Sequence, residues 1–364
     1  MDLSDFSRSN GGLYVPACQI LVDGSDLLRQ ELMAITQVEV DQVLQSAGRF
    51  TFTIVSAYSM EYHDFATAKR KNVFDLLRFG ASVSIAMGYG SRLPVLITGS
   101  ITEISTSFPE TGYPELVVSG YDRSFPMTTG KNTSTWNKRC DSDVVSEIAK
   151  KHSLDTDIDS TTDKHPRIEQ HQQTDLEFIK KLADRNHFEF YVRGDVLRFG
   201  KPKDKASGLI RMSWGEGLLS FKPEANLAGQ VASVEVYGWD PKNKQAIKGV
   251  ANAGDESGRE PSGTSGAEVM QRPGYQTPTI RLRQPVYTQS EADHRARAAL
   301  NERAKTFLTG EGECVGIPQL LPDESVTLEN LGPRFSKVYY VSETTHKFDS
   351  GGYRTRFKVK ETTL

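Results

Sequence analysis

Three aspartates alternate in a short segment whose spacing matches the start of a calcium-binding loop. Asp155, Asp157 and Asp159 supply the D-x-D-x-D carboxylates with which such a loop begins. The sixth loop position is Ser160, where a glycine is needed for the sharp turn, and the twelfth is Pro166, where a bidentate glutamate is needed. We therefore interpret this segment as an exposed edge strand rather than a calcium site.

A second group of potential metal ligands follows directly. Glu169 and His171 alternate on an expected strand near His165, so their carboxylate and imidazole groups could share a metal ion. The sequence has no HExxH or similar zinc spacing, and single histidines near strands are usually structural. We predict no metal ligands here.

Nucleotide-binding and nucleophile motifs are also missing from the sequence. Gly88-Tyr89-Gly90 lacks the third glycine and the following helix of a dinucleotide fingerprint. Neither GxxxxGK[ST] nor GxSxG occurs, and no spacing singles out a pair of acidic residues as a glycosidase dyad. We expect no catalytic residue and no cofactor, and nothing here requires an enzyme.

Composition limits the classes of partner. The 364 residues carry 44 basic and 47 acidic side chains, a net charge of −3, which argues against a DNA-coating protein and a polybasic membrane binder. Cys18, Cys140 and Cys314 are widely spaced, and we interpret them as buried thiols of a protein folded in a reducing cytoplasm. The first residues lack a secretion signal, and no apolar run is long enough to span a membrane.

The clearest local structure is a helix followed by a hairpin over residues 170–200. Thr174 and Glu177 predict a capping box at the helix start. Asn186-His187 predicts the helix end, and Arg193-Gly194-Asp195 predicts a tight turn between two strands. Apolar residues at helical spacing predict the buried face: Leu176, Phe178, Ile179, Leu182 and Ala183.

Residues before this unit read mainly as β-structure. About seven alternating strands over the first 125 residues are enough for a barrel or a sandwich, with Phe50, Phe52 and Ile54 on the inner face. The segment 62–80 interrupts them, with basic residues at Lys69, Arg70 and Lys71. A solvated loop is one interpretation of it. A helix capped at 141–143 then buries Val144, Val145, Ile148 and Ala149.

The later part of the chain returns to strands after a polar segment. Residues 251–274 are rich in Gly, Ser and Pro and predict an exposed loop. Thr288 and Glu291 predict a second capping box, opening a helix lined by alanines. The last fifty residues alternate as strands, with Tyr340 expected inside.

A carbohydrate-binding module would need an exposed aromatic platform, and the sequence has three tryptophans. Trp136, Trp214 and Trp239 lie in three different segments, with Trp239 at a strand end. We expect them to be core or turn anchors.

The ordered segments together resemble the phage late control gene D family, baseplate hub proteins similar to the amino-terminal hub part of VgrG spike proteins. The resemblance covers about residues 13 to 360. It is carried by VEVDQVLQSAGRFTFTI (38–54), GASVSIAMGYG (80–90), ITGSITEISTSFPETGYPELVVSGYDRS (97–124), SDVVSEIAKKHSL (142–154), QTDLEFIKKLADRNHFEFYV (173–192), WGEGLLSFKP (214–223), VASVEVYGWDPKNKQAI (231–247), SEADHRARAALNERA (290–304), GEGECVGIPQLLP (310–322) and LGPRFSKVYYVSETTHKF (331–348).

This resemblance implies a mainly β, α+β fold with two tube-type β-barrel domains and an α/β middle region. The expected divisions are a first barrel at 13–125, a middle domain at 126–224, a second barrel from 225–250 and 275–364, and an exposed loop at 251–274. It further implies a homotrimer that joins the six-fold tail tube to the three-fold central spike of a contractile tail or injection system. Expected partners are tube, spike, baseplate and wedge proteins, with tape-measure protein or cargo in the channel and no membrane.

The resemblance also sets the alternatives. It offers the 62–80 segment a role as a contact arm to neighbouring subunits or the tube. The chain ends at Leu364, so we expect the spike to be a separate protein, in a particle assembled in the bacterial cytoplasm. A tail-associated cell-wall hydrolase and a receptor- or carbohydrate-binding tail module are the competing functions.

Overall fold

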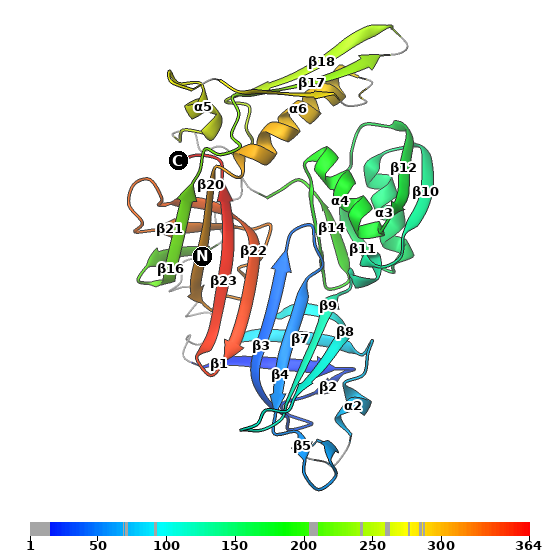
Figure 1. The fold of residues 1–364 in the computed structure, drawn as a ribbon, viewed down its shortest axis with the longest axis vertical. Coiled ribbons are helices and arrows are strands. Elements are labelled where there is room, and N and C mark those ends of the chain that lie inside the picture. The colour runs from blue at the N-terminus through cyan, green and yellow to red at the C-terminus, as the bar shows by residue number, and fades with distance from the viewer. Residues whose placement is uncertain are drawn as a thin grey trace.

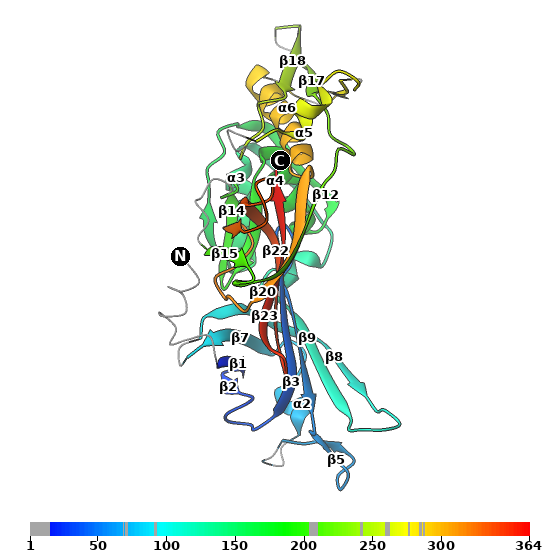
Figure 2. The ribbon, with the colours of Figure 1, turned by 90° about the vertical axis from the view of Figure 1, so that its left-hand side faces the viewer.

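The computed structural model describes residues 15–67, 69, 72–90, 93–203, 210–240, 243–258, 263–275, 277–283, 286 and 288–364. The molecule is elongated: β-sheet fills its lower part, a region with two helices lies beside the sheet, and a helix-covered sheet lies at the other end (Figures 1 and 2). None of the helices in the described residues combines the length and the apolar composition needed to cross a bilayer.

The amino-terminal strands form a curved antiparallel sheet, called here the first β unit. Its main strands pair in the order β1-β7-β8-β9-β4-β3. Phe50, Phe52 and Ile54 are fully buried, as predicted, because alternate residues of a strand point to one face. The elements of this part are β1 (Pro16–Val22), β2 (Ser25–Asp26), β3 (Ala34–Val43), β4 (Arg49–Val55), β5 (Tyr58–Ser59), β6 (Asp64–Phe65), α2 (Val73–Leu76), β7 (Ser82–Tyr89), β8 (Val95–Ser107) and β9 (Glu115–Asp122).

The carboxy-terminal strands close a six-stranded barrel. The order is β22-β21-β15-β16-β20-β23, and β23 pairs back onto β22. Closure leaves no free strand edge in this ring. We call it the closed barrel, and its strands are β15 (Ile210–Trp214), β16 (Gly217–Ala225), β20 (Leu308–Val315), β21 (Ser325–Glu329), β22 (Lys337–Asp349) and β23 (Gly352–Glu361).

One long strand, β22, belongs to both β units. β22 pairs with β21 over residues 337–340 and with β3 over residues 343–349, while β23 follows its other side. One hydrophobic core runs through both units as a result. Among the described strands, β1 forms no ladder with β23. The two units still touch, because the ring of Tyr89 on β7 lies 6.0 Å from the ring of Tyr353 on β23. Of the two barrels that were expected, the described strands form one closed barrel, and the first β unit is an open sheet.

The region after the first β unit has its own hydrophobic core. Helices α3 and α4 pack on short sheets, in which β10 pairs with β12, and β14 lies between β11 and β13. The elements are η1 (Phe125–Thr128), β10 (Asn132–Arg139), α3 (Asp141–Lys151), β11 (Asp155–Ile158), β12 (His165–Gln173), α4 (Asp175–Asn186), β13 (Glu189–Arg193) and β14 (Val196–Gly200). We call this the middle region.

Local signals in the middle region were predicted closely. The Glu177 amide donates to the Thr174 hydroxyl over 3.1 Å, and the Thr174 amide donates to the Glu177 carboxylate over 2.9 Å, which confirms the capping box. His187 takes the left-handed conformation that ends α4, with φ 55°. Helix α3 starts one residue earlier than predicted, with Cys140 at its cap.

A third sheet forms where the second barrel was expected to begin. Strands β17 (Ser233–Asp240), β18 (Gln245–Asn252) and β19 (Thr279–Arg283) pair with one another and not with the closed barrel, which corrects the assignment of 225–250. Helix α6 (Gln289–Ala304) lies directly on this sheet. A Cβ on Gly249 would come within 2.2 Å of the Ala292 backbone, so glycine permits the close approach. At the start of α6, the Glu291 amide donates to the Thr288 hydroxyl, and the Glu291 carboxylate binds Arg295.

Two other expected boundaries also differ. Strands β15 and β16 belong to the closed barrel and not to a middle domain ending at 224, because β15 pairs in parallel with β21. The segment 251–274 is not one exposed loop. It contains helix α5 (Gly266–Met270), whose cap residue Ser265 is fully buried, and Ala267 is buried beside it.

Tyr340 is buried but lies outside the shared core, contrary to the prediction that it faces the barrel interior. Its neighbours Tyr339 and Val341 are fully buried in the shared core instead. A register shift between Val341 and Glu343 changes which residues face inward, so that Thr344 and His346 are buried beyond it. The Tyr340 hydroxyl donates to Asp323 over 2.9 Å, outside the core.

Candidate assembly surface

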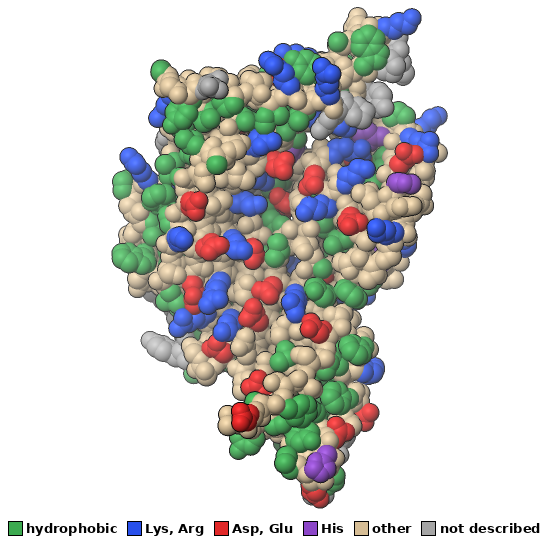
Figure 3. All heavy atoms as spheres, viewed as in Figure 1, with side chains coloured by type: hydrophobic (Ala, Val, Ile, Leu, Met, Phe, Trp, Pro, Cys, Tyr) green, Lys and Arg blue, Asp and Glu red, His purple; other side chains and the backbone are tan. Residues whose placement is uncertain are grey.

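The outer face of the closed barrel carries alternating charges. Strand β23 points Arg354, Arg356 and Lys358 outward, because Tyr353, Thr355 and Phe357 between them are buried. The neighbouring strands β20 and β22 supply acidic partners. Glu313 lies 3.0 Å from Arg354 and 3.5 Å from Arg356, and Glu343 lies 3.0 Å from Lys358. Figure 3 shows these mixed charges spread over the face.

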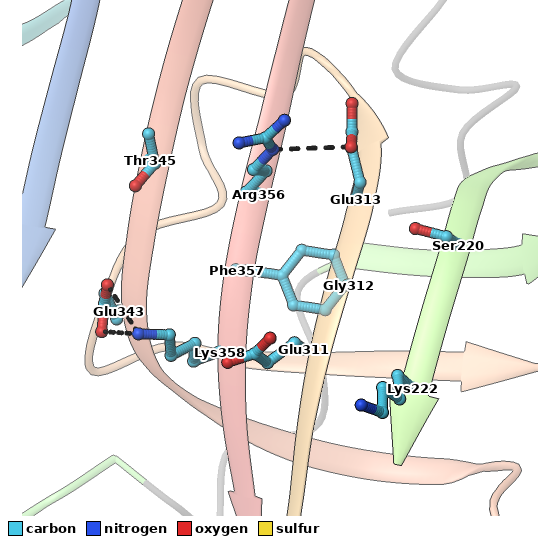
Figure 4. Close-up of a pocket in the computed structure, with 10 residues that line it drawn as sticks. All are labelled: Ser220, Lys222, Glu311, Gly312, Glu313, Glu343, Thr345, Arg356, Phe357 and Lys358. Atoms are coloured by element: carbon cyan, nitrogen blue, oxygen red, sulfur yellow. Dashed lines mark hydrogen bonds and ion pairs between the residues drawn. The ribbon is translucent and has the colours of Figure 1, made fainter.

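A shallow hollow of about 310 Å³ lies within this face. Figure 4 shows its rows of side chains rising from β16, β20, β22 and β23, with the Arg356–Glu313 and Lys358–Glu343 pairs on either side. The hydrogen bond from Lys358 to Glu343 raises the pKa of Lys358. Both carboxylates are held as ion-pair acceptors, so this geometry suits electrostatic contact with a partner surface.

A cluster of aromatic side chains marks the opposite end of the first β unit. Tyr58, Phe65, Phe74 and Phe108 meet edge to face, with ring centroids 5.3 to 6.0 Å apart. Such packing adds stability beyond area burial. Met60 and Tyr62, which follow Tyr58 closely in the chain, and Tyr113, which lies in the same turn as Phe108, are exposed. We call these seven residues the aromatic tip, and Figure 3 shows apolar side chains gathered over it.

Several side chains of the aromatic tip are largely exposed to solvent. Met60 is 75% exposed, Tyr113 is 74% exposed and Phe108 is 61% exposed. Contiguous exposed apolar surface is typical of an interaction site. Most of the tip lies in or just before the 62–80 segment considered as a contact arm, but Arg70 and Lys71 of its basic middle lie outside the described residues. Phe108 and Tyr113 were missed; aromatic residues inside the polar turn FPETGYP were the available signal.

Two of the three aspartates that could start a calcium loop, Asp157 and Asp159, bind an arginine instead. β11 is the edge strand of its sheet, as predicted. Arg198 lies 3.2 Å from Asp157 and 2.8 Å from Asp159. This hydrogen bonding lowers the pKa of Asp159.

The histidine and glutamate candidates are likewise engaged by charged neighbours. Glu169 pairs with Arg167, and the His165 ring lies 3.7 Å from Asp141. His171 is exposed on β12. In the part of the chain that the structure describes, no three His, Cys, Asp or Glu side chains converge on a possible metal position.

Buried side chains account for the Gly88-Tyr89-Gly90 segment and for the three cysteines. Tyr89 of Gly88-Tyr89-Gly90 is a buried core residue at the end of β7. Cys18, Cys140 and Cys314 are free and buried, as predicted. Burial raises the pKa of Cys18 to about 12, which suppresses the thiolate.

Two of the three tryptophans are more exposed than expected. Trp136 stacks on Phe178 at 5.6 Å and donates to Glu147. Trp214 is 62% exposed and Trp239 is 55% exposed, so neither is a core anchor. They lie on separate sheets, and neither stacks on another described aromatic ring. They therefore form no common platform.

Comparison with solved structures identifies proteins of similar fold. A 43 kDa tail protein of prophage MuSo2 from Shewanella oneidensis aligns with a TM-score of 0.72 and 12% identity, covering 95% of this chain and 98% of its own. A tail protein from Neisseria meningitidis aligns with a TM-score of 0.67 and 13% identity, over 96% and 97% of the two chains. A type VI secretion component from E. coli aligns with a TM-score of 0.58 and 10% identity, over 94% and 76%. The chain thus has the fold of tail and secretion-system proteins.

Sequence comparison gives a separate result. No curated protein matches the sequence. The family described as Alg8 N-terminal domain matches over residues 14–350, and the chain therefore belongs to that family.

Proposed function

We propose that this chain is a structural baseplate hub of a contractile phage tail or a related injection system. In this role it forms a homotrimer that joins a six-fold tail tube to a three-fold central spike, and it needs no catalysis and no cofactor. The observation that carries the proposal is the near end-to-end alignment with two phage tail proteins, over 95% and 96% of this chain. The likeness to late control gene D proteins belongs to the same proposal.

The arrangement of the β units supports a six-fold to three-fold match. Each chain contains two β units side by side, joined through the pairing of β22 with β3. Three chains with two units each would give six units around an axis, which is the symmetry of a tube. The trimer itself would keep the three-fold symmetry that a spike requires.

The two candidate surfaces supply contacts of different kinds. The aromatic tip offers exposed apolar area, which drives association through burial. The charged face of the closed barrel offers ion pairs, which mainly fix orientation and specificity. A ring of subunits needs both a firm contact and a defined register.

Mass measurement tests the proposal directly. Native mass spectrometry and light scattering of the purified chain at micromolar concentration should give a trimer, and electron microscopy should show a ring with an open channel. A chain that stays monomeric even with purified spike and tube proteins would contradict the hub role.

The chief alternative is a tail-associated cell-wall hydrolase. The isolated chain should fail to clear purified peptidoglycan. Clearing that is abolished by one carboxylate substitution would replace the structural role with an enzymatic one. A tail module that binds carbohydrate would instead give specific binding on a glycan array.

A further inference from the structure

A large cleft lies between the middle region, helix α6 and strands β22 and β23. Its volume is about 800 Å³, within the size range of ligand-binding sites. Helix α4 lines it with Lys180 and Lys181, α6 and the turn after it with Arg295 and Lys305, and β23 with Lys360. Figure 3 shows basic and acidic side chains along this junction.

The cleft is basic although the chain is acidic. Seven Lys or Arg and four Asp or Glu side chains line it, a net charge of +3, whereas the whole chain carries −3. Two of the cations, Arg185 and Arg295, are paired with Asp141 and Glu291 outside the lining, so the positive charge that remains for a ligand lies mainly on the lysines. A concave surface lined by one sign of charge attracts ligands of the opposite sign.

Some of this positive charge has no partner within the chain. Lys305 lies 3.5 Å from Glu189, and Lys358 is paired with Glu343. Among the described residues, Lys180 and Lys360 form no ion pair. Each partnerless ammonium group is available to a ligand carboxylate.

The pKa shifts of two residues in the cleft wall reflect burial and the nearby positive charge of Lys305. Burial lowers the pKa of Lys360; Glu189 opposes that shift, and Lys305 adds to it. Burial also lowers the pKa of His187 to about 4, and Lys305 adds to that shift as well. The wall is thus partly desolvated and positively charged, conditions under which a bound anion gains most.

We propose that this cleft binds an acidic peptide segment of a partner protein, with Lys180, Lys181 and Lys360 pairing with its carboxylates. A peptide fits better than a nucleic acid, because acidic residues such as Asp184 and Glu302 in the lining would repel a continuous phosphate backbone. Side chains of a peptide can be spaced to avoid them. This site is independent of the hub role.

Peptide binding to the full chain provides the test. Fluorescence anisotropy with a fluorescein-labelled hexaglutamate peptide should show saturable binding that weakens with added salt. The double variant Lys180→Glu, Lys181→Glu should weaken binding roughly tenfold, because two attractive contacts become repulsive. The matched control Lys131→Glu, Lys150→Glu changes the charge equally at exposed positions outside the cleft, and should stay within about twofold of the wild type.

Three outcomes would overturn the proposal. These are an absence of saturable binding to the wild-type chain, an equal loss in both double variants, or tighter binding of an oligothymidylate that displaces the peptide. Circular dichroism checks that both variants are folded. Trimer formation is measured separately by mass, so failure of the peptide site and failure of the hub role remain distinguishable.

Discussion

The first β unit and the closed barrel use similar antiparallel strands but end differently. The closed barrel returns to its starting strand through the β22–β23 ladder. The first β unit ends at β1 and β2 on one side and continues into β22 on the other. Every strand of the closed barrel is paired on both sides within the ring. The first β unit instead pairs its strand β3 with β22 of the barrel.

This difference has a consequence for folding. Because the two units share one core, global denaturation is expected to occur in one cooperative transition. The dependence is one-sided, however, since the first unit pairs its strand β3 with β22 of the barrel, while the ring of the barrel closes without β3. Substitutions in each unit can test the cooperative transition and the one-sided dependence separately.

The largest effect is expected from truncating buried aromatic residues in each unit. Phe357 lies in the barrel opposite Gly312, and Phe50 lies in the first unit opposite Gly120. Phe357→Ala and Phe50→Ala should each lower the free energy of unfolding by about 4 kcal/mol. Hydrogen exchange should speed up in both units for Phe357→Ala but mainly in the first unit for Phe50→Ala. Two separate denaturation transitions, each shifted by one variant, would refute the shared core.

Acid should destabilise the junction between the units. His346 is fully buried there on β22; its Nε2 donates to the Leu320 carbonyl over 3.1 Å, and its Nδ1 lies 2.8 Å from the Tyr353 hydroxyl. Burial lowers its pKa to about 4. The unfolded chain therefore binds a proton below pH about 6.5 that the folded chain refuses, and stability falls as pH drops toward 4.

The expected loss from His346 is about 2 kcal/mol between pH 7 and pH 5. His187 in the middle region, with its pKa also lowered to about 4, contributes a similar amount. Urea denaturation across this range should show a steeper pH dependence for the wild type than for His346→Gln. Equal slopes for the two proteins would show that His346 does not cause the loss of stability in acid.

The aromatic tip and the barrel surface should differ in association. Met60→Ser with Tyr113→Ser removes exposed apolar area, so it should leave folding within about 0.5 kcal/mol of the wild type. The affinity of the proposed trimer, measured by analytical ultracentrifugation, should fall about tenfold, because apolar contact area is removed. Leu219→Ser, which changes a half-exposed leucine on the barrel, serves as the control. An equal loss of affinity in the Leu219→Ser control would show that the aromatic tip contributes no more to association than the barrel surface does.

Local patterns predicted the strands and helices well, and long-range pairing less well. Alternation identified the inward face of β4, and the Thr174 capping box fixed the start of α4. A one-residue register shift was invisible to alternation, so the inward phase was assigned to Tyr340 instead of Tyr339.

The pairing partner of a strand is a property of the whole chain. Strand β17 alternates as a barrel strand would, yet it pairs with β18 and β19. The number of closed barrels escaped prediction for the same reason. For the candidate surfaces, the 62–80 segment was noticed, but Phe108 joins Tyr58 and Phe65 only through folding.

The smallest effects are expected on the charged faces, where the two units differ in burial. Glu313 in the barrel is 21% exposed and has two arginine partners, whereas Glu103 in the first unit is 60% exposed and has Arg49. Exposed pairs contribute little, because water screens them and ordering their side chains costs entropy. Glu313→Gln should therefore cost about 1 kcal/mol, and Glu103→Gln about 0.3 kcal/mol. Both costs should shrink in high salt, as urea denaturation at two ionic strengths would show. A larger cost for Glu103→Gln than for Glu313→Gln would mean that exposure does not govern these pairs, and that the first β unit relies on its surface charges more than the closed barrel does.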